Sequence, residues 1–230
     1  GKTPAMALLQ DRLLNAVTCV AVAAVEARAK RVAFDEQRVA RLVNGGLFFT
    51  ITNVNFDDAA VRARVDETIA ARNGLLASMG QEVSCAPDSC AGADVPFMFR
   101  SCDEDISSLR QLVVYGLKGM AAYLEHASVL GFDDAALHRA LQEALAKSAD
   151  PTASADDLVA LALEIGGLGV KSLALLDETN TKTYGNPEIS RVSLGVRGNP
   201  AILVSGHDLK DLEMLLEQTR GTGVDVYTHG

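Results

Sequence analysis

Residues 201–229 have the sequence AILVSGHDLKDLEMLLEQTRGTGVDVYTH, which decides the fold expected for the C-terminal part of the chain. Residues 201–205 form a continuous apolar run, which is typical of a buried parallel strand. A tight turn at 206–208 leads into a helix over 209–218, and glycines at 221 and 223 end that helix before a second strand at 224–227. Such a crossover is right-handed, so both strands end at one sheet edge, where open α/β sheets bind ligands. His207 and His229 lie at this edge.

Upstream of this unit, residues 4 to about 180 show helical periodicity. Helix-start signals are expected at Pro4, near Asp35, at Asn55 or Asp57, near Ile106, at Asp133 and at Asp156. In the fourth of these helices the spacing places four leucines inside: Leu109, Leu112, Leu117 and Leu124. Alternation at 191–196 predicts one more strand. We therefore expect a mainly α fold, with a multi-helix bundle domain over 1–186. An incomplete α/β domain (Rossmann-like, βαβ) follows over 187–230 and stops after its second or third strand.

Glycines are unusually frequent inside two of the expected helices. An interior glycine costs about 1 kcal/mol relative to alanine. We therefore expect these positions to mark close helix–helix contacts, where a side chain would not fit. They are Gly116, Gly119, Gly166, Gly167 and Gly169.

Composition and charge exclude several classes of partner. The 230 residues carry a formal net charge of −9, which disfavours nucleic acids and anionic membranes. Aromatic residues make up 5% and tryptophan is absent, so a stacking platform for bases is not expected. No uninterrupted apolar run approaches the roughly 18 residues of a membrane span, and no signal peptide is recognisable. We expect a cytoplasmic protein that binds neither nucleic acid nor membrane. The glycine at position 1 and the strand close to the last residue suggest a piece of a longer protein.

The four cysteines give no clear metal-binding pattern. Cys19 lies in a helix and is expected to be buried packing. Cys85 and Cys90 have the first spacing of a plant-type ferredoxin, but Cys102 is too distant for the following pair. The three cysteines of this irregular segment are therefore expected to be free thiols.

The other histidines lack the spacing of a metal site. Neither His126 nor His138 has a second ligand four residues away, so both are expected to be structural, with His138 in a charged surface stretch. His229 is expected to be a polar residue at a strand end. For His207 the residues alone leave two possibilities open, a turn histidine or a metal ligand.

Several segments together resemble one family. The segments VSGHDLKD at 204–211 and QTRGTGVDVYTHG at 218–230 carry the resemblance most specifically. Supporting matches lie across the rest of the chain: LLQD at 8–11, TITNVNFD at 50–57, YGLKG at 115–119 and YGNPEI at 184–189. The sequence resembles the hybrid-cluster proteins, also called prismane proteins or hydroxylamine reductases. Nearly the whole chain outside the cysteine-bearing segment takes part.

This resemblance implies an iron–sulfur oxidoreductase that reduces hydroxylamine to ammonia and water, with nitric oxide as a second candidate substrate. It implies a redox partner protein that donates electrons, and it implies two clusters in the intact protein, a hybrid iron–sulfur–oxygen cluster and a cubane cluster. The histidine of the Ser-Gly-His-Asp-Leu motif ligates the hybrid cluster in this family, and that role carries over to His207 as its metal and cofactor-binding residue. No catalytic residue is assigned.

The chain departs from the family pattern at its ends. The cysteine motif that holds the cubane cluster and the glutamate that follows Thr-His-Gly both lie outside the sequence. One ligand cannot hold a polynuclear cluster, so we expect no stably bound cluster and no activity for residues 1–230 alone. Two alternatives remain open, a piece of a nickel–iron carbon monoxide dehydrogenase-like protein and a non-catalytic helical scaffold.

Overall fold

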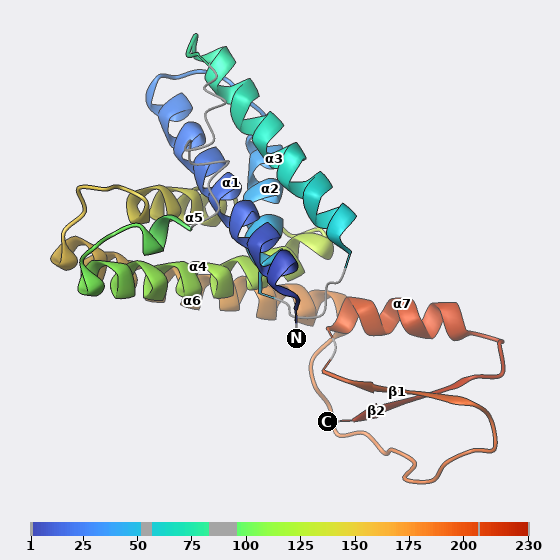
Figure 1. Ribbon diagram of the computed structural model, residues 1–230. Coiled ribbons are helices and arrows are strands. Elements are labelled where there is room, and N and C mark those ends of the chain that lie inside the picture. The colour runs from blue at the N-terminus through green and yellow to red at the C-terminus, as the bar shows by residue number, and fades with distance from the viewer. Residues whose placement is uncertain (1, 52–56, 83–95, 207, 230) are drawn as a thin grey trace.

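The computed structural model of the chain describes residues 2–51, 57–82, 96–206 and 208–229. Seven α-helices, one short 3-10 helix and two strands lie in these ranges (Figure 1). In chain order they are α1 Pro4–Ala29, α2 Glu36–Phe49, α3 Asp58–Ser78, η1 Phe97–Phe99, α4 Glu104–Val129, α5 Ala135–Ser148, α6 Ala155–Tyr184, β1 Ala201–Ser205, α7 Leu209–Thr219 and β2 Asp225–His229. The predicted fold class, mainly α with a small parallel α/β segment, is confirmed.

Most helices begin where a polar side chain can accept a hydrogen bond from the first turn. The Asp57 carboxylate accepts one from the backbone N–H of Ala60 at 3.0 Å and so caps α3, whereas Asn55 lies outside the described residues. Ser154 and Asp157 cap α6 reciprocally, with the Asp157 N–H donating to Ser154 Oγ at 3.2 Å. Each such cap satisfies backbone N–H groups that have no partner within the helix.

The helical core lies where two layers of helices cross. In Figure 1 α1 and α3 run together above α4 and α6, and α2 contacts both α1 and α4. The largest buried side chains in this core are mostly leucines from α1, α2, α4 and α5: Leu13, Leu14, Leu47, Leu117, Leu124, Leu141 and Leu145. Burial of a leucine side chain contributes about 1.5–3 kcal/mol, so this cluster supplies the main stabilisation of the bundle.

Two expectations for α4 and α6 are wrong. Leu112 is 59% exposed rather than inside, although Leu117 and Leu124 are fully buried. Of the five interior glycines, only Gly116 is at a close contact, because a Cβ built there would lie 3.2 Å from Ile165 Cγ2. A Cβ at any of the other four would meet no atom within 4 Å, and these are Gly119, Gly166, Gly167 and Gly169. Open surface, and not helix packing, surrounds those four positions.

The strand expected at 191–196 is also wrong. Residues 185–200 contain no strand, and the backbone N–H of Arg197 donates instead to the Tyr227 hydroxyl at 2.9 Å. Leu194 is 95% exposed, and its alternating neighbours Val192 and Val196 are exposed as well. Strand formation needs a neighbouring strand to receive its hydrogen bonds, and no described residue supplies one here.

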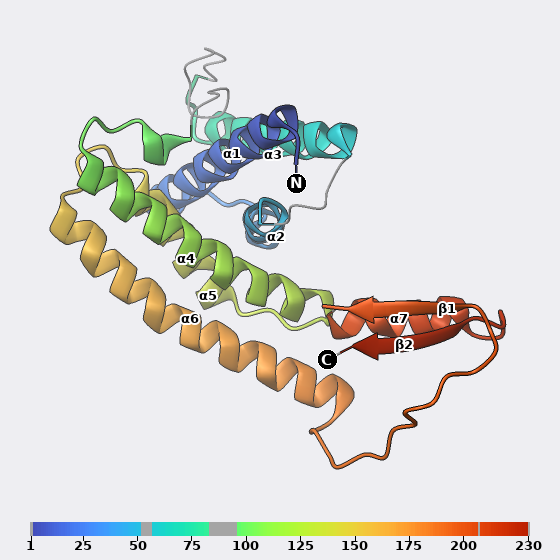
Figure 2. The same ribbon diagram turned by 60° about the horizontal axis from the view of Figure 1, so that its bottom comes forward.

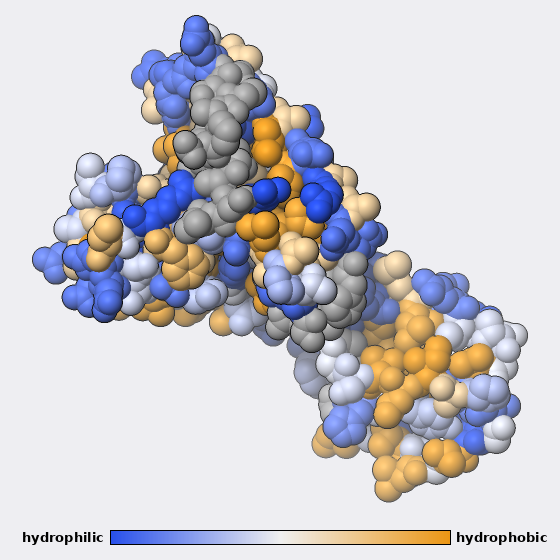
Figure 3. Space-filling view, in the orientation of Figure 1, coloured by the Kyte–Doolittle hydropathy of each residue, from blue (hydrophilic) through white to orange (hydrophobic). Residues whose placement is uncertain are grey.

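The α/β segment consists of two parallel strands and one helix. The strands pair with Ala201 opposite Asp225 and Ser205 opposite His229, as the crossover rule requires. No described residue after Thr179 is buried, and Figure 3 shows apolar side chains gathered on the visible surface of this segment. The bundle therefore has a core, whereas the described α/β segment has none of its own.

Two helices are long and apolar enough to cross a membrane by length and composition alone. A search for uninterrupted apolar runs does not find α6, because Glu164 and Lys171 lie within its apolar stretch. In α1, 72% of the qualifying window is buried inside the protein, as in a core helix, whereas in α6 the share is 22%. The exposure of α6 therefore needs a separate explanation.

Candidate functional site

The turn after β1 lies at the carboxyl edge of the two-stranded sheet. Ser205 ends β1 directly opposite His229, the last residue of β2. Gly206 has φ +62°, a conformation that a residue with a side chain rarely adopts, so glycine permits the sharp turn. The structure therefore places the predicted turn at the predicted sheet edge. His207 itself lies outside the described residues.

Asp208 ties this turn both to α7 and to the bundle. Its Oδ1 accepts a hydrogen bond from the backbone N–H of Asp211 at 2.8 Å and caps α7. Its Oδ2 lies 3.8 Å from His126 Nδ1 on α4, within ion-pair range when the imidazole is protonated. The His126 ring also packs edge-on against Phe48 of α2, with centroids 5.3 Å apart. One bundle helix, α4, thus contacts the residue that follows His207, and α2 packs on the His126 ring that makes the contact.

A second contact joins α6 to α7. The hydroxyl of Tyr184, the last residue of α6, donates to Glu213 Oε2 at 2.9 Å, and Lys210 Nζ lies 3.1 Å from the same oxygen. Partial burial and the Glu213 carboxylate raise the pKa of Tyr184 to about 12. The hydrogen bonds from Lys210 and Tyr184 lower the pKa of Glu213. This arrangement keeps the acceptor charged and the contact intact.

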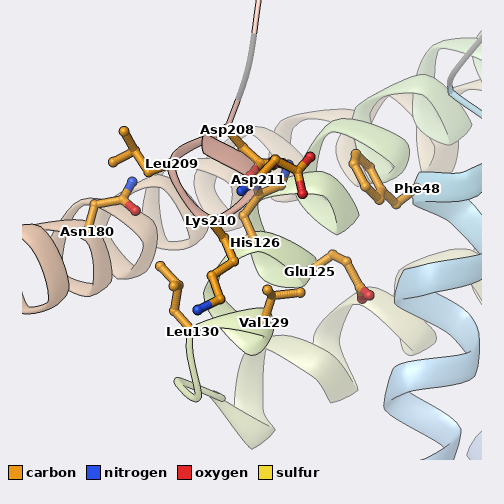
Figure 4. A pocket seen from close by; sticks show the side chains of 10 residues that line it. All are labelled: Phe48, Glu125, His126, Val129, Leu130, Asn180, Asp208, Leu209, Lys210 and Asp211. Carbon is orange, nitrogen blue, oxygen red and sulfur yellow. Dashed lines mark hydrogen bonds and ion pairs between the residues drawn. The ribbon is translucent and has the colours of Figure 1, made fainter. Parts of the chain in front are cut away.

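A cavity of about 220 Å³ lies beside the contact between Asp208 and His126, and both residues line it. Figure 4 shows that its walls come from α2, α4, α6 and α7, with apolar side chains on one part and charged ones on another. The lining residues are Phe48, Glu125, His126, Val129, Leu130, Asn180, Asp208, Leu209, Lys210 and Asp211. The cavity therefore adjoins the turn that carries His207 and has room for a small polar molecule.

Two carboxyl groups of this cavity hold protons more tightly than free carboxyls. Burial raises the pKa of Glu125, against the opposing effect of Arg64. Burial and the neighbouring Asp208 charge raise the pKa of Asp211. A carboxyl group whose pKa is raised is better suited to exchange protons near neutral pH than a free carboxyl group.

The described residues do not supply a metal-ligand set of their own. No group of three or more His, Cys, Asp or Glu side chains is clustered among them. Cys19 is buried in α1, as predicted, and Cys102 is exposed, while Cys85 and Cys90 lie outside the described residues. A polynuclear iron cluster needs several ligands. The donor groups described here therefore do not fit such a cluster by themselves.

One histidine lies elsewhere than the sequence predicted, and a second makes a contact that its spacing does not reveal. His138 is not on the surface but is buried, with Nδ1 2.6 Å from Asn44 Nδ2 and Nε2 3.0 Å from Asp133 Oδ1. His126 is predicted to be structural, which nothing here tests, and it contacts Asp208 beside the candidate site. Spacing within one helix cannot reveal this contact, because its partner comes from the α/β segment.

Comparison with known proteins covers the whole chain. Residues 1–230 match the sequence pattern of the Prismane/CO dehydrogenase family. The chain is 48% identical to the hydroxylamine reductase of Clostridium perfringens over 246 residues, which covers 100% of this chain and 44% of that protein. It is 50% identical to the hydroxylamine reductase of Desulfovibrio desulfuricans over 239 residues, with the same coverage. The chain thus spans less than half the length of these relatives. A match over its full length shows that the chain belongs to the Prismane/CO dehydrogenase family.

Proposed function

We propose that residues 1–230 are part of an iron–sulfur oxidoreductase that reduces hydroxylamine. The reaction cleaves the N–O bond with two electrons and two protons and gives ammonia and water. Nitric oxide is a second candidate substrate, and a redox partner protein supplies the electrons. The names of relatives that are 48–50% identical across the whole chain carry this proposal.

Within that protein, His207 is proposed as an iron ligand of a hybrid iron–sulfur–oxygen cluster. Its sequence neighbours support the role, because Ser205 and Gly206 place the turn at the carboxyl edge of parallel strands. Imidazole also suits an iron that has oxygen neighbours. The other ligands, and those of a separate cubane cluster, would come from polypeptide outside residues 1–230. When bound, such clusters supply electron transfer and substrate activation.

The contacts around Asp208 suit the same purpose. A ligand on a turn is aimed by what fixes that turn, and both α7 capping and the His126 contact act on the residue next to His207. The proposed domain division, a helical domain over 1–186 and the start of an α/β domain over 187–230, assigns this task to both domains. A cytoplasmic location without nucleic-acid or membrane partners belongs to the same proposal.

The decisive experiment uses the full-length protein with His207→Ala. We expect loss or rearrangement of the hybrid cluster in its electron paramagnetic resonance spectrum, near-complete loss of hydroxylamine reduction, and little change in the cubane signal. The matched control is His229→Ala, which removes the histidine at the end of the neighbouring strand and should leave the spectrum unchanged. A wild-type hybrid-cluster spectrum in His207→Ala would refute the ligand assignment.

A further inference from the structure

An apolar groove runs between α4 and α6 on a face that no other described element covers. Figure 2 shows the two helices side by side along much of their length, with no labelled element in front of them. The groove has a volume of about 520 Å³. Its exposed apolar side chains include Leu112, Tyr115, Leu163, Val170 and Leu173, with Leu163 75% exposed and Val170 67% exposed. A contiguous exposed apolar surface of this kind marks an interaction site.

The α6 wall of the groove has the spacing of a helix-packing seam. Leu163, Gly166, Val170 and Leu173 line the groove and follow one another at steps of three, four and three residues. This is the heptad alternation with which one helix presents a continuous stripe to another. The buried side of α6, which carries Leu158 and Leu161, is a different stripe that already packs on the bundle. The exposed seam is therefore a second packing face.

Glycines line the floor of the groove, and their lack of side chains allows another backbone to approach it closely. Gly119 of α4 and Gly166 and Gly169 of α6 line it, and a Cβ at any of them would meet no atom within 4 Å. Interior glycines cost helix stability, and in the described structure nothing offsets that cost at these positions. Close contact with another backbone would offset it.

The length of the relatives indicates what covers the groove. The chain corresponds to 44% of the two hydroxylamine reductases compared above, so more than half of their polypeptide lies outside it. The sheet has two strands, and apolar residues such as Leu203 are exposed on it. We infer that further polypeptide completes this α/β layer. A covalently attached segment also has a high effective concentration at the groove. A membrane is disfavoured, since α4, the other wall, does not pass the length-and-composition test that α6 passes.

We propose that the α4/α6 groove is the docking site for polypeptide that follows position 230, which lays an apolar helical face along the seam. The docking segment belongs to the same molecule. It joins the later part of the protein to the bundle through α4 and α6.

The test uses the full-length protein with a photo-crosslinking amino acid, benzoylphenylalanine, in place of Leu163. Irradiation followed by peptide mass spectrometry should join position 163 to a peptide that lies beyond position 230. Equal amounts of isotopically light and heavy protein are mixed before irradiation, and the crosslinked peptides should be wholly light or wholly heavy. Mixed-isotope crosslinks would mean a second copy in the groove, and crosslinks only within residues 1–230 would mean an internal rearrangement. Either result overturns the proposal.

Thiol labelling provides a second measurement that does not depend on crosslinking yield. In the full-length protein Leu163→Cys should react with a maleimide at least tenfold more slowly than Lys171→Cys, which lies on the exposed polar side of the same helix. The difference should persist on dilution and without lipid or detergent. Equal reactivity of the two thiols would show that the groove is open and would refute the docking.

Discussion

The capping of α7 by Asp208 can be tested by its removal. α7 has eleven residues and none of them is buried. Helices of this length are marginally stable on their own, so the cap is a large part of what holds α7 in place. Asp208→Ala removes the acceptor for the Asp211 N–H, which costs about 1 kcal/mol. It also removes the contact with His126, which contributes about 0.5 kcal/mol when the imidazole is protonated, because the two side chains are 3.8 Å apart and 30% and 31% exposed.

The sum, about 1.5 kcal/mol, corresponds to about a tenfold increase in the open population of α7. Native-state hydrogen exchange measured by NMR should therefore show α7 amides exchanging about tenfold faster in Asp208→Ala. Exchange in α4 and α6 should be unchanged, because opening of α7 does not require their core to open. Far-ultraviolet circular dichroism should remain close to wild type.

Two further variants separate the cap from other effects. Asp208→Asn keeps a side-chain oxygen for the cap and removes the charge, so α7 exchange should rise by about twofold at most. Asp134→Ala removes the cap of α5 in the bundle and should leave α7 exchange unchanged. If Asp208→Asn behaves like Asp208→Ala, the charge rather than the cap holds α7, and the reasoning fails. It also fails if exchange in Asp208→Ala equals wild type.

Three other predictions concern the bundle. Leu117→Ala should lower the free energy of unfolding by about 2–5 kcal/mol in urea titration, because it opens a cavity in a fully buried site; a smaller loss would mean that the core collapses around it. Gly167→Ala should stabilise the folded protein by about 1 kcal/mol, because a Cβ there meets no atom within 4 Å. Gly46→Ala should destabilise it, because the new Cβ would overlap Val17. Thermal melts in which Gly46→Ala is the more stable of the two variants would contradict the described packing. Burial lowers the pKa of Lys118 to about 8, so the unfolded state binds more protons between pH 8 and 10.5 and stability should rise with pH there. Lys118→Met should flatten that rise, and an equal slope in both proteins would exclude Lys118 as its source.

The sequence predicted the helices well because their signals are local. Asp35 and Asp57 cap helices as expected, and periodicity identifies the buried side of α4 through Leu117 and Leu124. Leu112 shows the limit of that argument. An apolar position on a helix is inside only if something packs on it, and nothing described covers this one. The strand predicted at 191–196 failed for the same reason, since strands depend on neighbours that the local pattern does not name.

The sequence predicts where the turn of the candidate site lies, but it does not predict the contacts that other helices make with this turn. The crossover rule put the turn after β1 at the sheet edge, which the parallel pairing confirms. The contact between His126 and Asp208, by contrast, joins two elements far apart in the chain and arises only from packing. The buried position of His138 was missed because nearby charges suggested a surface, whereas Asn44 and Asp133 satisfy its ring nitrogens inside the bundle.

The uneven distribution of buried residues has a consequence for synthesis on the ribosome. All buried residues described lie at or before Thr179, so the described helical core consists of residues that have emerged once that part of the chain has been made. Local helical contacts form quickly, and N-terminal units generally fold while the rest is still being translated. The βα turn would then emerge beside a bundle that is already folded, with His126 and Tyr184 in place to receive α7. Order of synthesis would thus match order of assembly, and the bundle would serve as the template on which the α/β layer is completed.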